Sequence, residues 1–307
     1  MRIIQKFMAN WNEIQQDIVK KGSTFDIVRR EFLQKLFEFS GRNVILYYSG
    51  WLQKNLPEIS REVALNDMDK NGFMTAINGL DSSRGLDLIL HTPGGEVAAT
   101  ESIIDYLKSK FSDIRAIIPQ LSMSGGTMIA CSSNRIVMGK HSSLGPVDPQ
   151  IGGIPAHGVV EEFERAHAEI KADQSRLAVW QFVLSKYSPT FLGECIKAVE
   201  WSEKILVESL KDRMFKDSKD KERMAEKVKT ELCDHSISLS HSRHLSSRKC
   251  KEIGLTVEEL ENDPVLQDLV LSLHHITMQT LAMTPAFKII ENQNGQAFIQ
   301  SVTFEKG

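Results

Sequence analysis

Short apolar runs alternate with segments whose apolar residues recur at helical spacing. The runs are rich in β-branched and aromatic residues and predict four strands, NVILYYSG (43–50), LDLILH (86–91), RAII (115–118) and NRIVMG (134–139). The segments between them predict three helices, in NGFMTAINGL (71–80), in EVAATESIIDYLKSKF (96–111) and from TMIACSS (127–133) onward. Strands alternating with helices at this spacing predict βαβ units and a parallel sheet.

The flanking segments are mainly helical. The chain becomes helical again from about Gly158, and an apolar helix around residues 264–283 precedes the glycine-containing tail IIENQNGQAF. We see no internal repeat and no low-complexity linker, so one core with extensions is expected. The expected units are an N-terminal helical extension (1–41), an α/β core (42–260) with a helical insertion at about 195–235, and a C-terminal helical extension and tail (261–307).

Composition narrows the function classes. The chain has 307 residues and a formal net charge of −3, which gives no reason to expect a nucleic-acid partner. Its four cysteines are widely spaced and suit reduced thiols better than disulfides or a zinc site. Because the N-terminus lacks the apolar stretch of a signal peptide and no run approaches the length of a spanning helix, a cytoplasmic protein without a membrane span is expected.

Two glycine turns, HTPGGEVAA and SMSGGTMIA, each follow a predicted strand and precede a predicted helix. In a parallel sheet both turns fall at the carboxyl ends of strands, where open α/β folds build their sites. Ser124 lies beside the second turn, and its hydroxyl could attack a carbonyl whose oxygen is bound by the N–H groups of Gly95 and Gly125. The alternative reading is two glycine turns that are neighbours for structural reasons alone.

Several long blocks in order resemble the serine dehydrogenase proteinase family, whose members are related to ClpP and to signal peptide peptidase A. The blocks are GRNVILYYSGWLQK, NGFMTAINGLD, LDLILHTPGG, MSGGTMIA, SSLGPVDPQIGGIPA, KYSPTFLGEC and TPAFKIIEN. The family usually reads M-S-A-G-T where this chain has Gly125 and Gly126, a small change at a small-residue turn. The resemblance implies a ClpP/crotonase-like fold and a serine peptidase that cleaves peptides or unfolded proteins.

The resemblance also implies a catalytic order of serine, aspartate and histidine. Asp148 lies close to the position of the ClpP histidine, and His241 lies two residues before Arg243, near the position of the ClpP aspartate. The two roles are thus exchanged between the two loci. Ser124 is then the nucleophile, His241 the general base and Asp148 the group that orients the imidazole.

Other readings stay open. A serine–lysine dyad, as in signal peptide peptidase A, would use Lys186 as the base, and His141 or His157 could serve if His241 is remote. A crotonase-like acyl-CoA enzyme needs the two N–H groups but no serine, and an inactive oligomeric scaffold needs neither. The family resemblance implies a homo-oligomer. We expect no cofactor and no metal, since DMDKNG (67–72) lacks the final acid of a calcium loop and is interpreted as a turn and helix cap.

Overall fold

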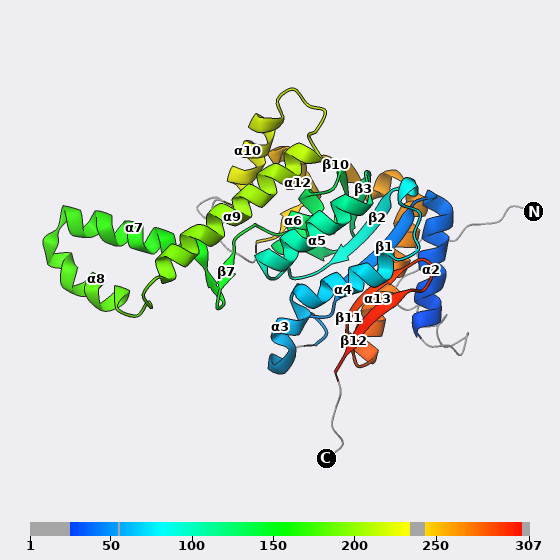
Figure 1. The fold of residues 1–307 in the computed structure, drawn as a ribbon, viewed down its shortest axis with the longest axis horizontal. Coiled ribbons are helices and arrows are strands. Elements are labelled where there is room, and N and C mark those ends of the chain that lie inside the picture. Colours follow the sequence, from blue (N-terminus) through cyan, green and yellow to red (C-terminus); the bar gives the residue numbers. More distant parts are fainter. Residues whose placement is uncertain (1–24, 55, 234–242, 303–307) are drawn as a thin grey trace, which may run out of the picture.

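The computed structural model describes residues 25–54, 56–233 and 243–302. Its centre is a seven-stranded sheet in the order β10-β5-β3-β2-β1-β11-β12 (Figure 1). The strands are β1 (Asn43–Ser49), β2 (Leu86–His91), β3 (Ile114–Ile118), β5 (Arg135–Met138), β10 (Val257–Glu259), β11 (Ala286–Asn292) and β12 (Ala297–Ser301). A small sheet contains β4 (Leu121–Ser122), β6 (Ser143–Leu144) and β9 (Leu245–Ser246), and a hairpin contains β7 (Gln150–Ile151) and β8 (Ile154–Pro155).

The helices connect and cover these strands. The α-helices are α2 (Phe25–Ser40), α3 (Ser60–Val63), α4 (Asp67–Ile77), α5 (Val97–Lys110), α6 (Gly125–Cys131), α7 (Ala156–Ala172), α8 (Leu177–Leu184), α9 (Phe191–Asp212), α10 (Lys221–Cys233), α12 (Ser247–Ile253) and α13 (Pro264–Met283). Short 3₁₀ turns are η1 (Pro57–Ile59), η2 (Ser82–Arg84), η3 (Gln174–Arg176) and η4 (Leu260–Asn262).

The parallel part of the sheet confirms the expected βαβ units, because β1, β2, β3, β5 and β10 pair in parallel. The C-terminal tail differs from the expectation. Strand β11 pairs antiparallel with β1, and β12 returns antiparallel to β11, so the tail adds two strands to the main sheet. The turn between them contains Asn294 and Gly295, whose φ of 77° is a left-handed conformation that glycine adopts at no steric cost.

Alternate residues of each strand face two separate apolar layers. In β1, Ile45 and Tyr47 join one cluster, together with residues of α4, α5 and α6. Their neighbours Leu46 and Tyr48 join the other, together with residues of α2 and α13. Because both faces are covered, every residue of β1 and β2 is buried, as a continuous apolar run predicts.

An arm built from α7, α8 and the first turns of α9 projects from this body (Figure 1). It has a small apolar cluster of its own around Val159 and Cys195. Large apolar side chains on α8 are nevertheless exposed, with Val179 at 63% and Phe182 at 67%. The arm therefore carries more apolar surface than its own packing covers.

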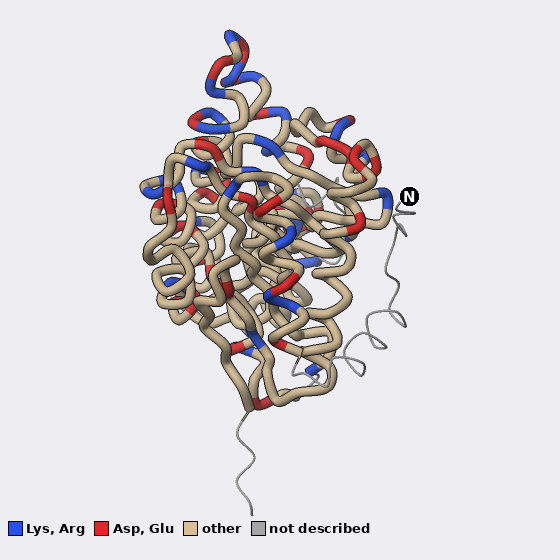
Figure 2. Tube along the Cα trace, turned by 90° about the vertical axis from the view of Figure 1, so that its right-hand side faces the viewer, with Lys and Arg blue, Asp and Glu red and all other residues tan. Residues whose placement is uncertain are grey.

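Positions of Lys and Arg are interspersed with those of Asp and Glu along the chain trace in the view of Figure 2. Such mixing is typical of solvated segments. No helix in the described ranges combines the length and the apolar character needed to cross a membrane.

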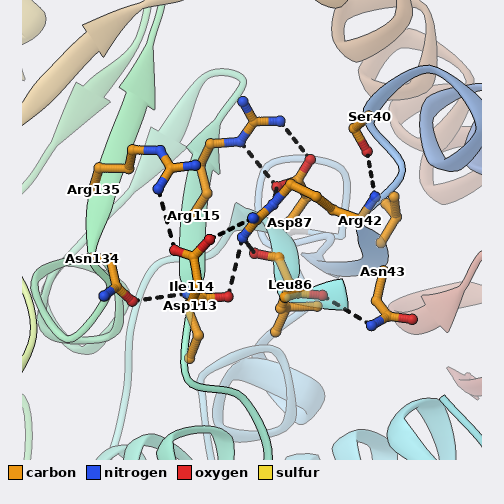
Figure 3. A network of polar contacts seen from close by, with 12 residues as sticks. Ser40, Arg42, Asn43, Leu86, Asp87, Asp113, Ile114, Arg115, Asn134 and Arg135 are labelled. Carbon is orange, nitrogen blue, oxygen red and sulfur yellow. Dashed lines mark hydrogen bonds and ion pairs between the residues drawn. The ribbon is translucent and has the colours of Figure 1, made fainter. Parts of the chain in front are cut away.

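A network of ion pairs joins the amino ends of β1, β2, β3 and β5, at the opposite edge of the sheet from the glycine turns (Figure 3). Buried Asp87 accepts from Arg42 Nε at 2.7 Å and from Arg115 Nη2 at 2.6 Å. Asp113 accepts from Arg42 Nη1 at 2.5 Å and from Arg135 Nη1 at 3.2 Å. The network therefore ties these four strands together at their amino ends. The glycine turns lie at the opposite, carboxyl ends.

Removing Asp87 should destabilise the sheet strongly. Asp87→Ala leaves two arginines without their shared buried carboxylate, and breaking such a pair costs about 3–5 kcal/mol of unfolding free energy. Urea unfolding followed by circular dichroism measures the change. Asp212→Ala, which loses an exposed pair with Lys108, is the matched control and should leave the midpoint unchanged. Equal midpoints for both variants would contradict the structural role of Asp87.

Candidate active site

The two glycine turns lie side by side, as the sequence predicts. Thr92, which follows β2, pairs with Ser122 of β4 in a parallel bridge. The N–H of Met123 donates to the carbonyl of Thr92 at 3.0 Å, and the N–H of Thr92 donates to the carbonyl of Leu121 at 3.2 Å. The segment that contains Ser124 is therefore hydrogen-bonded directly to the segment that contains Gly94 and Gly95.

Ser124 has a strained backbone, with φ of 49° and ψ of −114°. Only Ser124 and Thr190 combine a positive φ with a side chain among the described residues. Ser124 is the residue that precedes α6, yet its hydroxyl caps no N–H of that helix. Strain of this kind costs about 1–3 kcal/mol and persists where the surroundings enforce it, commonly at functional sites. Ser124, which is partly buried, thus lies at a sharp strand-to-helix turn.

The surrounding glycines are required by close packing. A Cβ on Gly94 would lie 2.7 Å from the Ser124 Cβ, and its φ of 85° also favours glycine. A Cβ on Gly95 would lie 2.1 Å from the carbonyl oxygen of Leu65. A Cβ on Gly125 would lie 2.6 Å from the hydroxyl of Thr100 and 3.4 Å from the N atom of Gly95. The N–H groups of Gly95 and Gly125 are therefore close neighbours.

Neither of these two N–H groups donates a hydrogen bond to another described residue. The bridge between Gly95 and Leu65 uses the carbonyl of Gly94 and the N–H of Glu96, which leaves the Gly95 N–H outside the pairing. Gly125 is the first residue of α6, where an N–H has no partner within the helix. Two neighbouring N–H donors without an acceptor among the described residues, next to a serine, are the kind of groups that bind an oxyanion.

Asp148 is buried, at 1% exposure, in the loop that follows β6. The N–H of Gly145 donates to the carbonyl of Ser122 at 3.2 Å, which ties the start of this loop to the Ser124 turn. The N–H of Val147 donates to the carbonyl of Leu232 at 2.8 Å, which ties it to the end of α10. Asp148 is therefore held between the serine turn and α10.

His241 lies outside the described residues. The described chain on either side of it reaches the same region, because the last turn of α10 accepts, at the Leu232 carbonyl, from the N–H of Val147, the residue before Asp148. The chain continues in β9, whose residues Leu245 and Ser246 pair with β6, the neighbour of β4. The base role of His241 stays a prediction.

Lys186 lies at the end of α8 on the arm, where its exposed ammonium stands 4.6 Å from the centre of the Phe182 ring. A lysine acts as a base when burial lowers its pKa, and this position offers no burial. His157 is the second residue of the arm helix α7, and His141 is exposed in the loop after β5. Cys131 is fully buried, and burial raises the pKa of its thiol, which fits the expected packing role.

A buried polar cluster near the first glycine turn was not predicted from the sequence. It consists of Tyr47, Asp69 and Lys288, all fully buried. Asp69 was interpreted only as part of a helix cap, and the structure confirms a capping box in which Asn66 and Asp69 begin α4. The available signal was Lys288 in the apolar run AFKIIEN, because a lysine inside a covered strand needs a buried partner.

A second group of rings lies on the opposite face of the sheet. His91, the last residue of β2, packs with its ring centre 4.4 Å from that of Trp51 and 5.1 Å from that of Tyr48. Its partner His274 accepts or donates a hydrogen bond with the Tyr48 hydroxyl at 2.8 Å. Burial lowers the pKa of His91 from 6.5 to about 3 and that of His274 well below its ordinary value.

Because the pKa values of these two histidines are lowered, we expect the folded protein to lose stability in mild acid. Between pH 6.5 and about 3 the unfolded chain binds a proton at His91 that the folded chain does not, so the unfolding free energy falls as pH falls. One such group contributes about 1.4 kcal/mol per pH unit. His91→Phe keeps the ring packing and should flatten the dependence, measured by urea unfolding at pH 7, 6 and 5. Identical slopes for wild type and variant would contradict this.

A family model described as ClpP-like SDH-type serine proteinase matches residues 57–290, a range that contains both glycine turns and Asp148. Two uncharacterized proteins of Methanocaldococcus jannaschii are similar to this chain. MJ0137 is 33% identical over 190 residues, which cover 62% of this chain and 59% of that protein. MJ1495 is 34% identical over 189 residues, which cover 62% of this chain and 57% of that protein. The chain thus spans less than two thirds of the length of these relatives.

Proposed function

The chain belongs to the ClpP-like SDH-type serine proteinase family, and from that premise we propose that it hydrolyses peptide bonds of peptides or unfolded proteins through an acyl-enzyme on Ser124. The observation that carries the proposal is the strained serine beside two N–H groups, those of Gly95 and Gly125, that bind no described residue.

The reaction uses the residues in these roles. His241 accepts the proton of the Ser124 hydroxyl as the oxygen attacks the substrate carbonyl. The N–H groups of Gly95 and Gly125 bind the oxyanion of the tetrahedral intermediate. When the C–N bond breaks, His241 returns the proton to the leaving amine, and water then repeats both steps on the ester and releases Ser124. Asp148 orients the imidazole and stabilises its charged form.

The placement of Asp148 supports this assignment over the lysine dyad. Asp148 is buried and joined through its loop to both the serine turn and α10. The exposed ammonium of Lys186 on the arm lacks the burial that a lysine base needs.

Exposed apolar residues on the arm support the proposal that the chain forms a homo-oligomer. Leu177, Val179 and Phe182 of α8 are each more than half exposed, and an apolar surface of this kind is typical of a protein interface. A second copy of the chain is the partner that the family resemblance implies, and sedimentation velocity measures the assembly.

The direct test of the proposed reaction is a burst experiment with a nitrophenyl peptide ester, followed by intact-mass measurement. We expect one rapid equivalent of nitrophenol and a mass increase equal to one acyl group per chain. The same preparation should cut a chemically unfolded protein into peptides. Turnover without a covalent intermediate would favour the crotonase-like reading, and no turnover of either substrate by the folded protein would favour the scaffold.

A further inference from the structure

A fully buried ion pair lies behind the first glycine turn. Lys288 of β11 places its Nζ 2.8 Å from Oδ1 and 3.0 Å from Oδ2 of Asp69 in α4. Burial lowers the pKa of Lys288, and the charge of Asp69 opposes that effect. Desolvation of two charges commonly costs as much as their attraction returns, so a buried pair is weak evidence of a stabilising role. Its contacts suggest what else it does.

One branch of contacts leads from Lys288 to the outer side of the turn. The Lys288 ammonium also donates to the carbonyl of Ala64 at 2.8 Å. The next residue, Leu65, donates its N–H to the carbonyl of Gly94 at 2.7 Å and accepts from the N–H of Glu96 at 2.9 Å. Leu65 therefore brackets Gly95, and Lys288 fixes the peptide that precedes it.

A second branch leads from Asp69 to the inner side of the turn. The Tyr47 hydroxyl donates to Oδ2 of Asp69 at 2.9 Å, and burial raises the pKa of Tyr47, which keeps that proton in place. The Thr92 side chain lies near the Tyr47 hydroxyl and lowers its pKa, against the effect of burial. The Thr92 hydroxyl oxygen in turn accepts from the N–H of Gly94 at 3.1 Å. The buried ion pair is thus connected through the Tyr47 hydroxyl to the neighbourhood of Thr92, whose hydroxyl binds the Gly94 N–H.

We propose that Lys288, acting with Asp69 and Tyr47, is a positioning residue that holds the oxyanion-binding turn from two sides. The two branches meet at Gly94 and Gly95, so the Gly95 N–H keeps its direction while charge develops on the substrate. Preorganised donors need no rearrangement in the transition state, and small displacements of them cost large factors in rate. This inference rests on the proposed peptidase function and adds three residues that do not touch the substrate.

The test compares Lys288→Met and Tyr47→Phe with a matched control in α2, Arg29, whose buried partner lies on the same strand as Lys288. Arg29→Met removes a buried partner of Glu291 in β11, while Arg30 remains paired with that carboxylate at 2.6 Å. Kinetics with the peptide ester are measured at a temperature where circular dichroism shows each variant folded. We expect kcat to fall about 10–100-fold in Lys288→Met and about 3–10-fold in Tyr47→Phe, with KM within about threefold. Arg29→Met should keep kcat.

A spectroscopic readout separates positioning from general destabilisation. The phosphoryl oxygen of a fluorophosphonate adduct on Ser124 occupies the place of the oxyanion, so its ³¹P shift reports the N–H donors. The shift should move in Lys288→Met and Tyr47→Phe but not in Arg29→Met. Should Lys288→Met fail to fold, Tyr47→Phe decides the question, since it removes one oxygen only.

The outcomes for the inference and for the proposed function differ. An active wild type whose kcat and ³¹P shift are unchanged in Tyr47→Phe and in folded Lys288→Met would overturn the positioning role alone. A folded wild type that neither hydrolyses the ester nor forms the adduct would overturn the proposed function and this inference with it.

Discussion

Ser124→Ala should lower kcat for ester and peptide hydrolysis by about 10⁵-fold, because no other group can form the acyl bond. The residual rate reflects binding and the N–H groups of Gly95 and Gly125, which the substitution leaves in place. KM should change little, since the hydroxyl contributes mainly in the transition state. Initial rates at saturating substrate measure the loss.

A matched serine provides the control for this change. Ser132 lies just after α6, where its hydroxyl donates to the carbonyl of Ile129 at 2.7 Å. Ser132→Ala should hydrolyse the ester at the wild-type rate. Wild-type turnover in Ser124→Ala would contradict the nucleophile assignment and favour an enzyme that uses the N–H groups without a serine.

Asp148→Asn should reduce kcat by about 10⁴-fold. The amide nearly matches the carboxylate in shape, but it can neither hold the imidazole in the correct tautomer nor stabilise the imidazolium. The variant should bind substrate with little change in KM and should react slowly with a fluorophosphonate. Single-turnover rates separate this chemical defect from a defect in binding.

Asp173→Asn is the control for the loss of a carboxylate. Asp173 lies on the exposed arm, where its side chain accepts from the N–H of Ser175 at 2.9 Å. Its replacement should leave kcat unchanged. Wild-type kcat in Asp148→Asn would mean that Asp148 serves only to fix its loop against α10, and the base would then act without this partner.

Local patterns predicted the parallel core well. Continuous apolar runs identified β1, β2, β3 and β5 because these strands are covered on both faces. The two glycine turns were identified because a strand, a paired glycine and a helix follow one another within a few residues. The strained φ of Ser124 was not predictable, because a sparsely populated backbone conformation persists only where the surrounding structure enforces it, and no local pattern reports it.

The antiparallel strands β11 and β12 at the edge of the main sheet were not predicted, because their pairing is not local in the sequence. Strand β11 lies beside β1 although about 240 residues separate them along the chain, and no local period reports such pairing. The Asn294–Gly295 turn was the available signal for the hairpin. The same long separation hid the pairing of Lys288 with Asp69, since the apolar run around Lys288 indicates that it needs a buried partner but not which residue provides it.

The candidate triad could be predicted only in part from the residue patterns alone. Ser124 and the two N–H donors followed from the turns, whereas the roles of Asp148 and His241 came from the family resemblance. The structure adds the burial of Asp148 and the ties of its loop to β4 and α10.

The most direct measurement of the central claim is labelling of the folded wild-type protein with a fluorophosphonate, followed by intact-mass analysis and peptide mapping. If Ser124 is the activated nucleophile, we expect a single adduct per chain on the peptide that contains Ser124, with no adduct on Ser124→Ala. An unlabelled folded wild type, or an adduct that persists on Ser124→Ala, would contradict this role of Ser124.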